Sequence, residues 1–480
     1  MKRIHIILIL VLLLNSCVRH EKPLIITPDE KFTEIRKEII NLVKSKKVGS
    51  FSVAVIKKNE ILWKESFIDV EDSIRIESDA VYPIASMSKS MSATIVHKLS
   101  DRGVLSLDDP VVKYVKDFSF PIERSLTLKE LLNMTAGVPH GWIFIESKFQ
   151  NEKIDVNELS NLYNFTSFPK GVYEYSNFSY GILERVIEKV TDETYDEVMQ
   201  RELFAPLEMN NSYVKIEDSE YLTSTEKYSF YPKAGAGIYS NLSDLMKYAT
   251  LHLKQKEGFM SMSSLHKMHN EKTSKDGVMA LGIGNISLND NNTWLVSNGS
   301  FSFPITSNSN LTILPDKELA IICLADKDYN SMADITSIKI ANLFSPKFQE
   351  IVFAKIEAYE KGRDLSKEIS EKVSWRGYVK HENLEVPFYL KYDDKQMFYR
   401  SDTSSTYKKV KNIKLDHQSI VRGNIQLRIQ NPFTKELELA DCTINLKLDD
   451  NRLVGYVAAS FKSKGEYFIS IPFFTEVKKV

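Results

Sequence analysis

The order of apolar and polar residues predicts a mixed helix and strand region at the start of the chain. In residues 30–47, apolar side chains recur every three or four positions, which is typical of an amphipathic helix. Two apolar stretches follow at 50–57 and 60–67 and predict strands, joined by a tight turn at Lys58-Asn59. The chain therefore opens with one helix and a pair of neighbouring strands.

A second helical pattern begins at Ser86, and its apolar residues share one face that we expect to be buried. These residues are Met91, Ile95, Val96 and Leu99. A short helix is predicted near Val111–Val115. Much later, strands at 310–314 and 319–324 and a helix near 333–343 complete an α/β layer.

The pattern changes in the last part of the chain. Residues 347–371 are charged and helical in pattern, which suits a connector. From Ser374 onward, short alternating runs rich in Tyr, Phe, Val and Ile are separated by Asp-Asp, Gly-Asn and Asp-Asn turns. We therefore expect a mixed α/β domain at 30–345, a helical connector at 346–372 and a small antiparallel β domain at 373–480. This β domain is either a structural appendage or a substrate-gating or wall-binding module.

Composition narrows the class of protein. The chain has 480 residues, 43% of them hydrophobic and 26% charged, which suits two packed domains. Its formal net charge is −1 and it has no large basic block, so no nucleic-acid partner is expected. The nine histidines are scattered without acidic or cysteine partners at zinc-like spacing. We expect neither a metal nor another cofactor, and the sequence specifies no oligomeric state.

The sequence of the N-terminus is typical of an export signal. Two basic residues precede an apolar run that is too short to span a bilayer, and the run ends in Leu14-Asn15-Ser16-Cys17. This ending resembles the lipobox of bacterial lipoproteins, whose signal is cut before a lipidated cysteine. It predicts a signal peptide at 1–16, a tether at 17–29 and a lipid on Cys17 that holds the chain at the cell envelope, facing the periplasm or exterior. The alternative is a plain secretory signal with an incidental cysteine.

Candidate chemistry begins at Ser86 and Lys89, which share one face of the predicted helix because they lie three residues apart. A serine hydroxyl needs a nearby base, and a desolvated lysine can serve because burial lowers its pKa. The first helical turn also directs free N–H groups at developing negative charge. The spacing alone is weak evidence, because it recurs at Ser167/Lys170 and Ser405/Lys408, where it fits a helix cap and a solvated lysine.

A second candidate segment is Tyr175-Ser176-Asn177, which leads into a long predicted helix. Placed opposite Ser86, the tyrosine can accept or relay a proton, and the asparagine amide can hold Lys89 and a substrate carbonyl. The alternative is a loop tyrosine packed on a helix with an N-capping asparagine.

Taken together, these segments resemble the β-lactamase-related serine hydrolases, a group that includes class C β-lactamases, D-alanyl-D-alanine peptidases and serine esterases. The matching segments lie in family order within residues 30–345: Ile84–Ser90, Gly103–Tyr114, Thr127–Pro139, Tyr175–Asn177, Phe204–Met209, and Gly235–Ser240 before Asp244. The resemblance implies an α/β fold in which a β-lactamase/transpeptidase-like domain, with an antiparallel sheet flanked by helices and an all-helical part, precedes a β-barrel. It also implies that Ser86 is the acylated nucleophile, that Lys89 and Tyr175 transfer protons, and that Asn177 positions substrate.

The family's third motif, a Lys or His followed by a small residue and Gly, is altered. On the matching strand, Gly299 and Ser300 fit, and the Ser300 N–H is implied as an oxyanion donor. The cationic position is Ser297, or Asn298 if the register shifts by one. Met134 stands where the family usually has His. We therefore expect a serine hydrolase acting on an ester or amide, with a small-molecule or peptidoglycan-derived substrate. The alternative is a penicillin-binding-like protein that recognises peptidoglycan peptides or β-lactams without efficient turnover.

Overall fold

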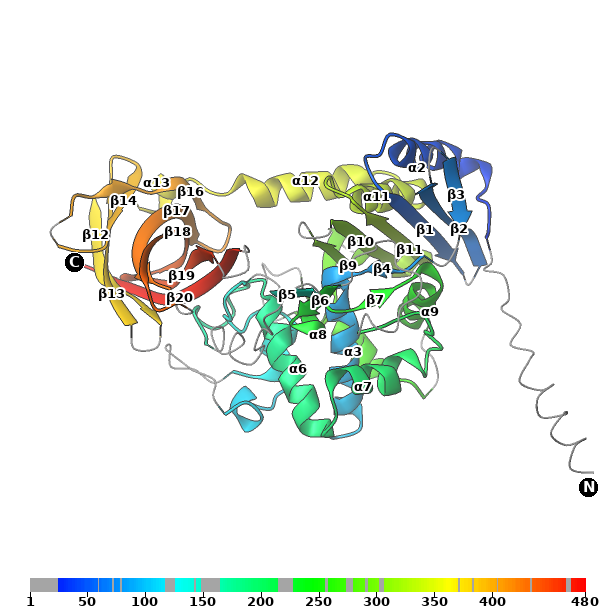
Figure 1. Cartoon of the computed structure of the whole chain (residues 1–480), viewed down its shortest axis with the longest axis horizontal. Coiled ribbons are helices and arrows are strands. Elements are labelled where there is room, and N and C mark those ends of the chain that lie inside the picture. Colours follow the sequence, from blue (N-terminus) through cyan, green and yellow to red (C-terminus); the bar gives the residue numbers. More distant parts are fainter. Residues whose placement is uncertain are drawn as a thin grey trace, which may run out of the picture.

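The computed structural model describes most of the chain in two folded parts (Figure 1). The predicted signal, Cys17 and Asn59 of the expected tight turn lie outside the described residues. The described ranges are 25–58, 60–70, 73–77, 80–116, 126–141, 144–147, 165–214, 228–254, 258–272, 279–289, 292–301, 306–369, 372–381, 384–403, 405–431, 434–462 and 468–480.

The first part is built on a seven-stranded antiparallel sheet. Its strand order is β3-β2-β1-β11-β10-β9-β8, so the first and last strands of this part pair at its centre. The central strands are buried along nearly their whole length because helices cover both faces, which explains their continuous apolar runs. The bounds are β1 Ser50–Lys57, β2 Glu60–Val70, β3 Ser73–Glu77, β8 Gly284–Asn289, β9 Asn292–Phe301, β10 Ser307–Leu314 and β11 Leu319–Asp326.

One face of the sheet is covered by the N-terminal helix and the helix that ends this part, which Figure 1 shows above the sheet. The amphipathic helix predicted at 30–47 is confirmed as a 3-10 turn at Glu30–Phe32 followed by α2 at Thr33–Lys44. Its apolar stripe, including Ile35, Ile39 and Val43, packs against the strands. The helix expected near 333–343 is α11, Met332–Phe344.

The other face carries the helical region that holds the site. The helix expected from Ser86 begins with a 3-10 turn at Ala85–Met87 and continues as α3, Ser88–Asp101. The other bounds are η3 Val111–Lys113, α4 Leu128–Leu132, α6 Asn177–Thr191, α7 Tyr195–Met199, η4 Gln200–Phe204, α8 Lys233–Ala236, α9 Leu242–Leu253, α10 Met262–Asn270, and the strand pairs β4 Tyr82–Pro83 with β7 Tyr239–Ser240 and β5 Phe144–Ser147 with β6 Tyr228–Tyr231.

A connector made of α12, Phe348–Lys361, and α13, Leu365–Glu368, leads to the C-terminal β domain (Figure 1). This domain is a nine-stranded, nearly closed antiparallel barrel with the order β15-β14-β13-β12-β20-β19-β18-β17-β16. The bounds are β12 Val373–His381, β13 Leu384–Asp393, β14 Gln396–Arg400, β15 Lys408–Lys409, β16 Lys411–Leu415, β17 Ile420–Gln430, β18 Leu437–Asp449, β19 Arg452–Lys462 and β20 Phe468–Lys479.

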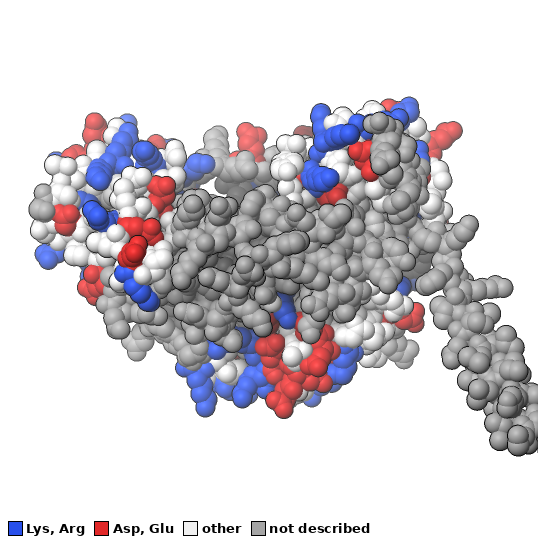
Figure 2. Space-filling model, viewed as in Figure 1, with Lys and Arg blue, Asp and Glu red and all other residues white. Residues whose placement is uncertain are grey.

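Three further features concern the cysteines, the distribution of surface charge and the length of the apolar helices. Cys323 and Cys442 are buried free thiols in different parts of the fold. Figure 2 shows basic and acidic side chains side by side over the described surface of both parts. Within the described ranges, no helix is long and apolar enough to cross a bilayer.

Candidate active site

Ser86 sits on a tight turn between a short strand and a helix. The residue before it, Ala85, has a φ of 47°, in the left-handed region that few non-glycine residues adopt. The turn is anchored on both sides of the chain, because the Ile84 N–H donates to the Ile238 carbonyl and the Ile84 carbonyl accepts from Ser309 Oγ. The strained turn therefore presents the Ser86 hydroxyl at the start of the central helix, partly open to solvent.

Lys89 points its amine at Ser86 from one turn further along. Its Nζ lies 3.0 Å from Ser86 Oγ and 2.7 Å from both Asn177 Oδ1 and the Gly235 carbonyl. The side chain is only 2% exposed, and burial lowers the pKa of Lys89 well below its usual value. A neutral amine can donate to Asn177 and Gly235 and direct its lone pair at the Ser86 hydroxyl.

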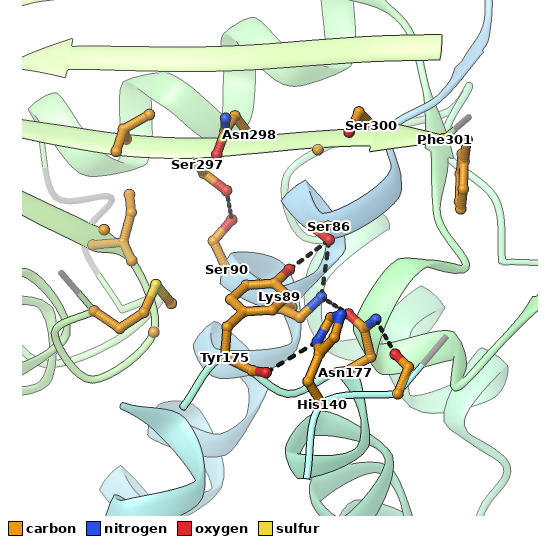
Figure 3. A pocket seen from close by; sticks show the side chains of 17 residues that line it. Ser86, Lys89, Ser90, His140, Tyr175, Asn177, Ser297, Asn298, Ser300 and Phe301 are labelled. Carbon is orange, nitrogen blue, oxygen red and sulfur yellow. Dashed lines mark hydrogen bonds between the residues drawn. The ribbon is translucent and has the colours of Figure 1, made fainter. Parts of the chain in front are cut away.

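Tyr175 contacts Ser86 from the same side as Lys89, whose amine lies 4.9 Å from the centre of the Tyr175 ring (Figure 3). Its hydroxyl donates to Ser86 Oγ over 2.7 Å (Figure 3). Burial raises the pKa of Tyr175 to about 12, although the hydrogen bond with Ser86 opposes the shift. The phenol is therefore a proton donor at neutral pH.

Asn177 holds Lys89 rather than capping the helix that it begins. Ser176 occupies the N-cap, and its side chain accepts from the Ser179 N–H. Asn177 Nδ2 donates to the Gly141 carbonyl over 2.9 Å, which turns Oδ1 toward Lys89. The N-capping alternative for this asparagine is thus wrong.

Strand β9 forms the opposite wall of the site, and successive side chains of the altered third motif point to different sides of the strand. Ser297 is buried and donates to Ser90 Oγ on α3, whereas the exposed Asn298 donates to Asp334 on α11 (Figure 3). Ser297 therefore points toward α3 and Asn298 toward α11, and both line the site. A Cβ on Gly299 would lie 2.3 Å from the Ser86 nitrogen, so this close approach requires glycine. Ser300 lines the site beyond it.

These residues enclose a cavity of about 430 Å³. Lys89 is the only lysine or arginine among the described residues that line it. Lys233, the first residue of α8, is not among the lining residues and forms an ion pair with Asp196. The lining residues are Ser86, Lys89, Ser90, His140, Gly141, Tyr175, Asn177, Met279, Gly282, Ile283, Gly284, Val296, Ser297, Asn298, Gly299, Ser300 and Phe301.

Sequence reasoning missed two contributors to this site. His140 lies beside Tyr175, with ring centroids 5.8 Å apart and its Nδ1 3.1 Å from the Tyr175 carbonyl oxygen. Nothing in the local pattern singled it out. The carbonyl of Gly235 was within a recognised segment, but only the packing of α8 on α3 shows that it accepts from Lys89. Met134 lies behind the site, where its sulfur accepts from the Ser176 N–H.

The fold and the Ser-Lys-Tyr cluster are typical of a serine hydrolase with a β-lactamase-like domain. A family model described as Beta-lactamase matches residues 35–343, which is more than half of the chain. The chain therefore belongs to the β-lactamase family, in which serine hydrolases predominate.

Known proteins support the same fold. "Beta-lactamase-like protein 2" of Dictyostelium discoideum is 24% identical over 55% of this chain and 54% of its own length, so the chain spans about half of that relative. An octameric penicillin-binding protein homologue from Pyrococcus abyssi has a TM-score of 0.56 at 18% identity, over 92% of this chain and 99% of its own. A Beta-lactamase/D-alanine Carboxypeptidase from Yersinia pestis, complexed with citrate, has a TM-score of 0.53 at 19% identity. The match covers 66% of this chain and 99% of that protein.

Proposed function

We propose that this protein cleaves an ester or amide bond through an acyl-enzyme on Ser86. The observation that carries the proposal is the convergence of a desolvated lysine and a protonated tyrosine on one serine hydroxyl, at 3.0 Å and 2.7 Å. A nucleophile with a base in hydrogen-bond reach, itself oriented by a third group, is the arrangement that covalent catalysis needs. Here Asn177 and the Gly235 carbonyl orient the base.

The steps follow from these contacts. Lys89 accepts the hydroxyl proton as Ser86 Oγ attacks the carbonyl carbon, and Tyr175 donates its proton to the departing oxygen or nitrogen. The proton on Lys89 then restores Tyr175. Water then attacks the acyl group with Lys89 as base, and this proton passes to Ser86 Oγ as the bond between the acyl carbon and Ser86 breaks and the acid leaves. Each bond that forms is matched by one that breaks.

The oxyanion of the tetrahedral intermediate is assigned to the backbone N–H groups of Ser86 and Ser300. Gly299 brings strand β9 against the Ser86 nitrogen, which supports this assignment. Preorganised donors of this kind contribute about 3–4 kcal/mol each to the transition state.

Substrate preference follows from Ser297. A lysine at this position can hold the carboxylate of penicillins or D-alanyl-D-alanine peptides, a charge-assisted hydrogen bond that contributes roughly 1.5–3 kcal/mol. Here Ser297 bonds Ser90 instead. Substrates without a carboxylate lose nothing by this change, so we propose that short uncharged esters are preferred.

We expect measurable turnover of p-nitrophenyl acetate or butyrate and poor hydrolysis of nitrocefin. Losing the carboxylate contact costs about ten- to a hundred-fold in kcat/KM, because each 1.36 kcal/mol is a factor of ten. Ser297→Lys should narrow the difference between the two substrates, whereas Ser297→Met, of similar length and uncharged, should not. Nitrocefin turnover as fast as ester turnover in steady-state assays would refute the ester preference.

A second candidate function is recognition of peptidoglycan peptides or β-lactams without efficient turnover. The missing Lys or His at Ser297 favours it, and the complete Ser-Lys-Tyr cluster favours hydrolysis. Burst kinetics separate the two: a binding protein releases at most one equivalent of p-nitrophenol per chain, while a hydrolase continues at a steady rate.

We also propose that a lipid on Cys17 anchors the chain at the cell envelope. The proposal rests on the Leu14-Asn15-Ser16-Cys17 sequence after a short apolar run. Cys17→Ala should give an unlipidated protein, seen as soluble protein or uncleaved precursor on membrane fractionation. A wild-type chain that is wholly soluble and unmodified would contradict the anchor.

A further inference from the structure

The C-terminal barrel contacts the segment that leads into Tyr175. Apolar residues from this segment, Phe168 and Val172, pack against Ile420, Tyr456 and Ala458 of the barrel. The Phe168 and Tyr456 rings meet edge to face, with centroids 5.8 Å apart. The barrel therefore packs against chain that is only a few residues from a group in the active site.

A glutamine of the barrel pairs with the backbone of Tyr173. The buried side chain of Gln418 lies in the turn between β16 and β17, donates to the Tyr173 carbonyl and accepts from the Tyr173 N–H, each over 2.7 Å. Asp416 fixes this turn by accepting from the N–H groups of Gln418 and Ile420. The Gln418 side chain thus satisfies both backbone groups of Tyr173, as the backbone of a neighbouring strand would do.

The next residue, Glu174, is bound by two further barrel side chains. Its buried carboxylate accepts from Arg422 Nη2 over 2.8 Å and from the Tyr456 hydroxyl over 2.5 Å. Burial alone would lower the pKa of Arg422, but the Glu174 carboxylate raises it overall. Removing Arg422 would leave the buried Glu174 carboxylate without its compensating charge, which is locally destabilising.

From these contacts we infer that Gln418, Arg422 and Tyr456 are positioning residues for Tyr175. They bind Tyr173 and Glu174, the two residues before Tyr175. The position of these two residues matters because the Tyr175 hydroxyl must stay within hydrogen-bond reach of Ser86 Oγ. Misplacement of a reacting group by about 1 Å can cost about a hundred-fold in rate. The barrel thus helps to hold Tyr175 in its place in the active site. This inference rests on the proposed function of Tyr175.

The test compares Arg422→Met with Arg452→Met in the full chain. Arg452 is a matched control, because it is also on a barrel strand, pairs with two carboxylates, Asp449 and Glu476, and has the same exposed fraction of 37%. We expect Arg422→Met and Gln418→Ala to lower kcat for p-nitrophenyl acetate about ten- to a hundred-fold with little change in KM. Arg452→Met should keep the wild-type kcat. Arg422→Lys should recover part of the loss.

Two further measurements separate this inference from the proposed function. Glu174→Gln and Arg422→Met should be non-additive in kcat, because both remove the same contact. In a crystal structure of Arg422→Met, the distance from the Tyr175 hydroxyl to Ser86 Oγ should exceed about 3.5 Å. If this distance and kcat both stay at wild-type values, the barrel does not position Tyr175, although the hydrolase proposal stands. If wild type has no turnover, the hydrolase proposal fails and the crystallographic distance still decides the positioning role.

Discussion

Lys89→Ala is expected to lower kcat/KM for p-nitrophenyl acetate by a factor on the order of 10³. The substitution removes the base 3.0 Å from Ser86 Oγ and leaves Asn177 Oδ1 and the Gly235 carbonyl without their donor. Lys98→Ala is the control, since Lys98 lies on the same helix but pairs with Glu202 outside the cavity. Steady-state kinetics on folded protein, checked by thermal unfolding, measure the difference. An equal loss of kcat/KM in Lys89→Ala and Lys98→Ala would contradict the role of Lys89 as the base.

The same lysine sets the expected pH dependence. Lys89 must be neutral to accept a proton, and its neutral fraction increases as pH rises through its pKa. Burial lowers that pKa, so kcat/KM should rise with pH and reach its plateau well below the usual lysine range.

Tyr175→Phe is expected to lower kcat by about 10²–10³-fold, within the usual contribution of general acid–base catalysis. The change removes a hydroxyl that donates to Ser86 Oγ over 2.7 Å and leaves the ring in place. Because the pKa of Tyr175 is about 12, the phenol stays protonated across the assay range, and the rising limb due to Lys89 should persist in the variant.

Tyr195→Phe is the matched control for Tyr175→Phe. The Tyr195 hydroxyl also bonds a serine of α3, Ser92, over 2.7 Å, but it is buried outside the cavity. Its removal should leave kcat close to wild type. A Tyr175→Phe variant that retains wild-type kcat would show that another group protonates the leaving group.

Sequence reasoning was most informative where the signal is local. The amphipathic period over 30–47 and the strands at 310–314 and 319–324 correspond to α2, β10 and β11, with ends that differ by a few residues. The three-residue spacing of Ser86 and Lys89 predicted a shared face, and their side chains lie within hydrogen-bond distance. These elements and the shared face of Ser86 and Lys89 could be predicted because they depend on residue spacing, which is read directly from the sequence.

What the sequence did not indicate depends on tertiary contacts or backbone strain. An alanine does not favour a positive φ, so the turn at Ala85 carries no signal. The register of Ser297 and Asn298 is set by pairing with β10, in which Ser297 faces Leu311. The contact of Gln418 with Tyr173 joins residues 245 positions apart, and no pattern of either segment predicts it.

The most direct test of the account is the mass of the intact protein after reaction with a fluorophosphonate probe. We predict one adduct per chain, located on Ser86 by peptide mapping, and none in Ser86→Ala under the same conditions. Ser88→Ala is the control, because Ser88 is buried two residues away with its hydroxyl bonded to the Ile238 N–H, and it should label like wild type. Labelling that persists in Ser86→Ala, or a wild-type chain that never labels, would contradict an acyl-enzyme on Ser86.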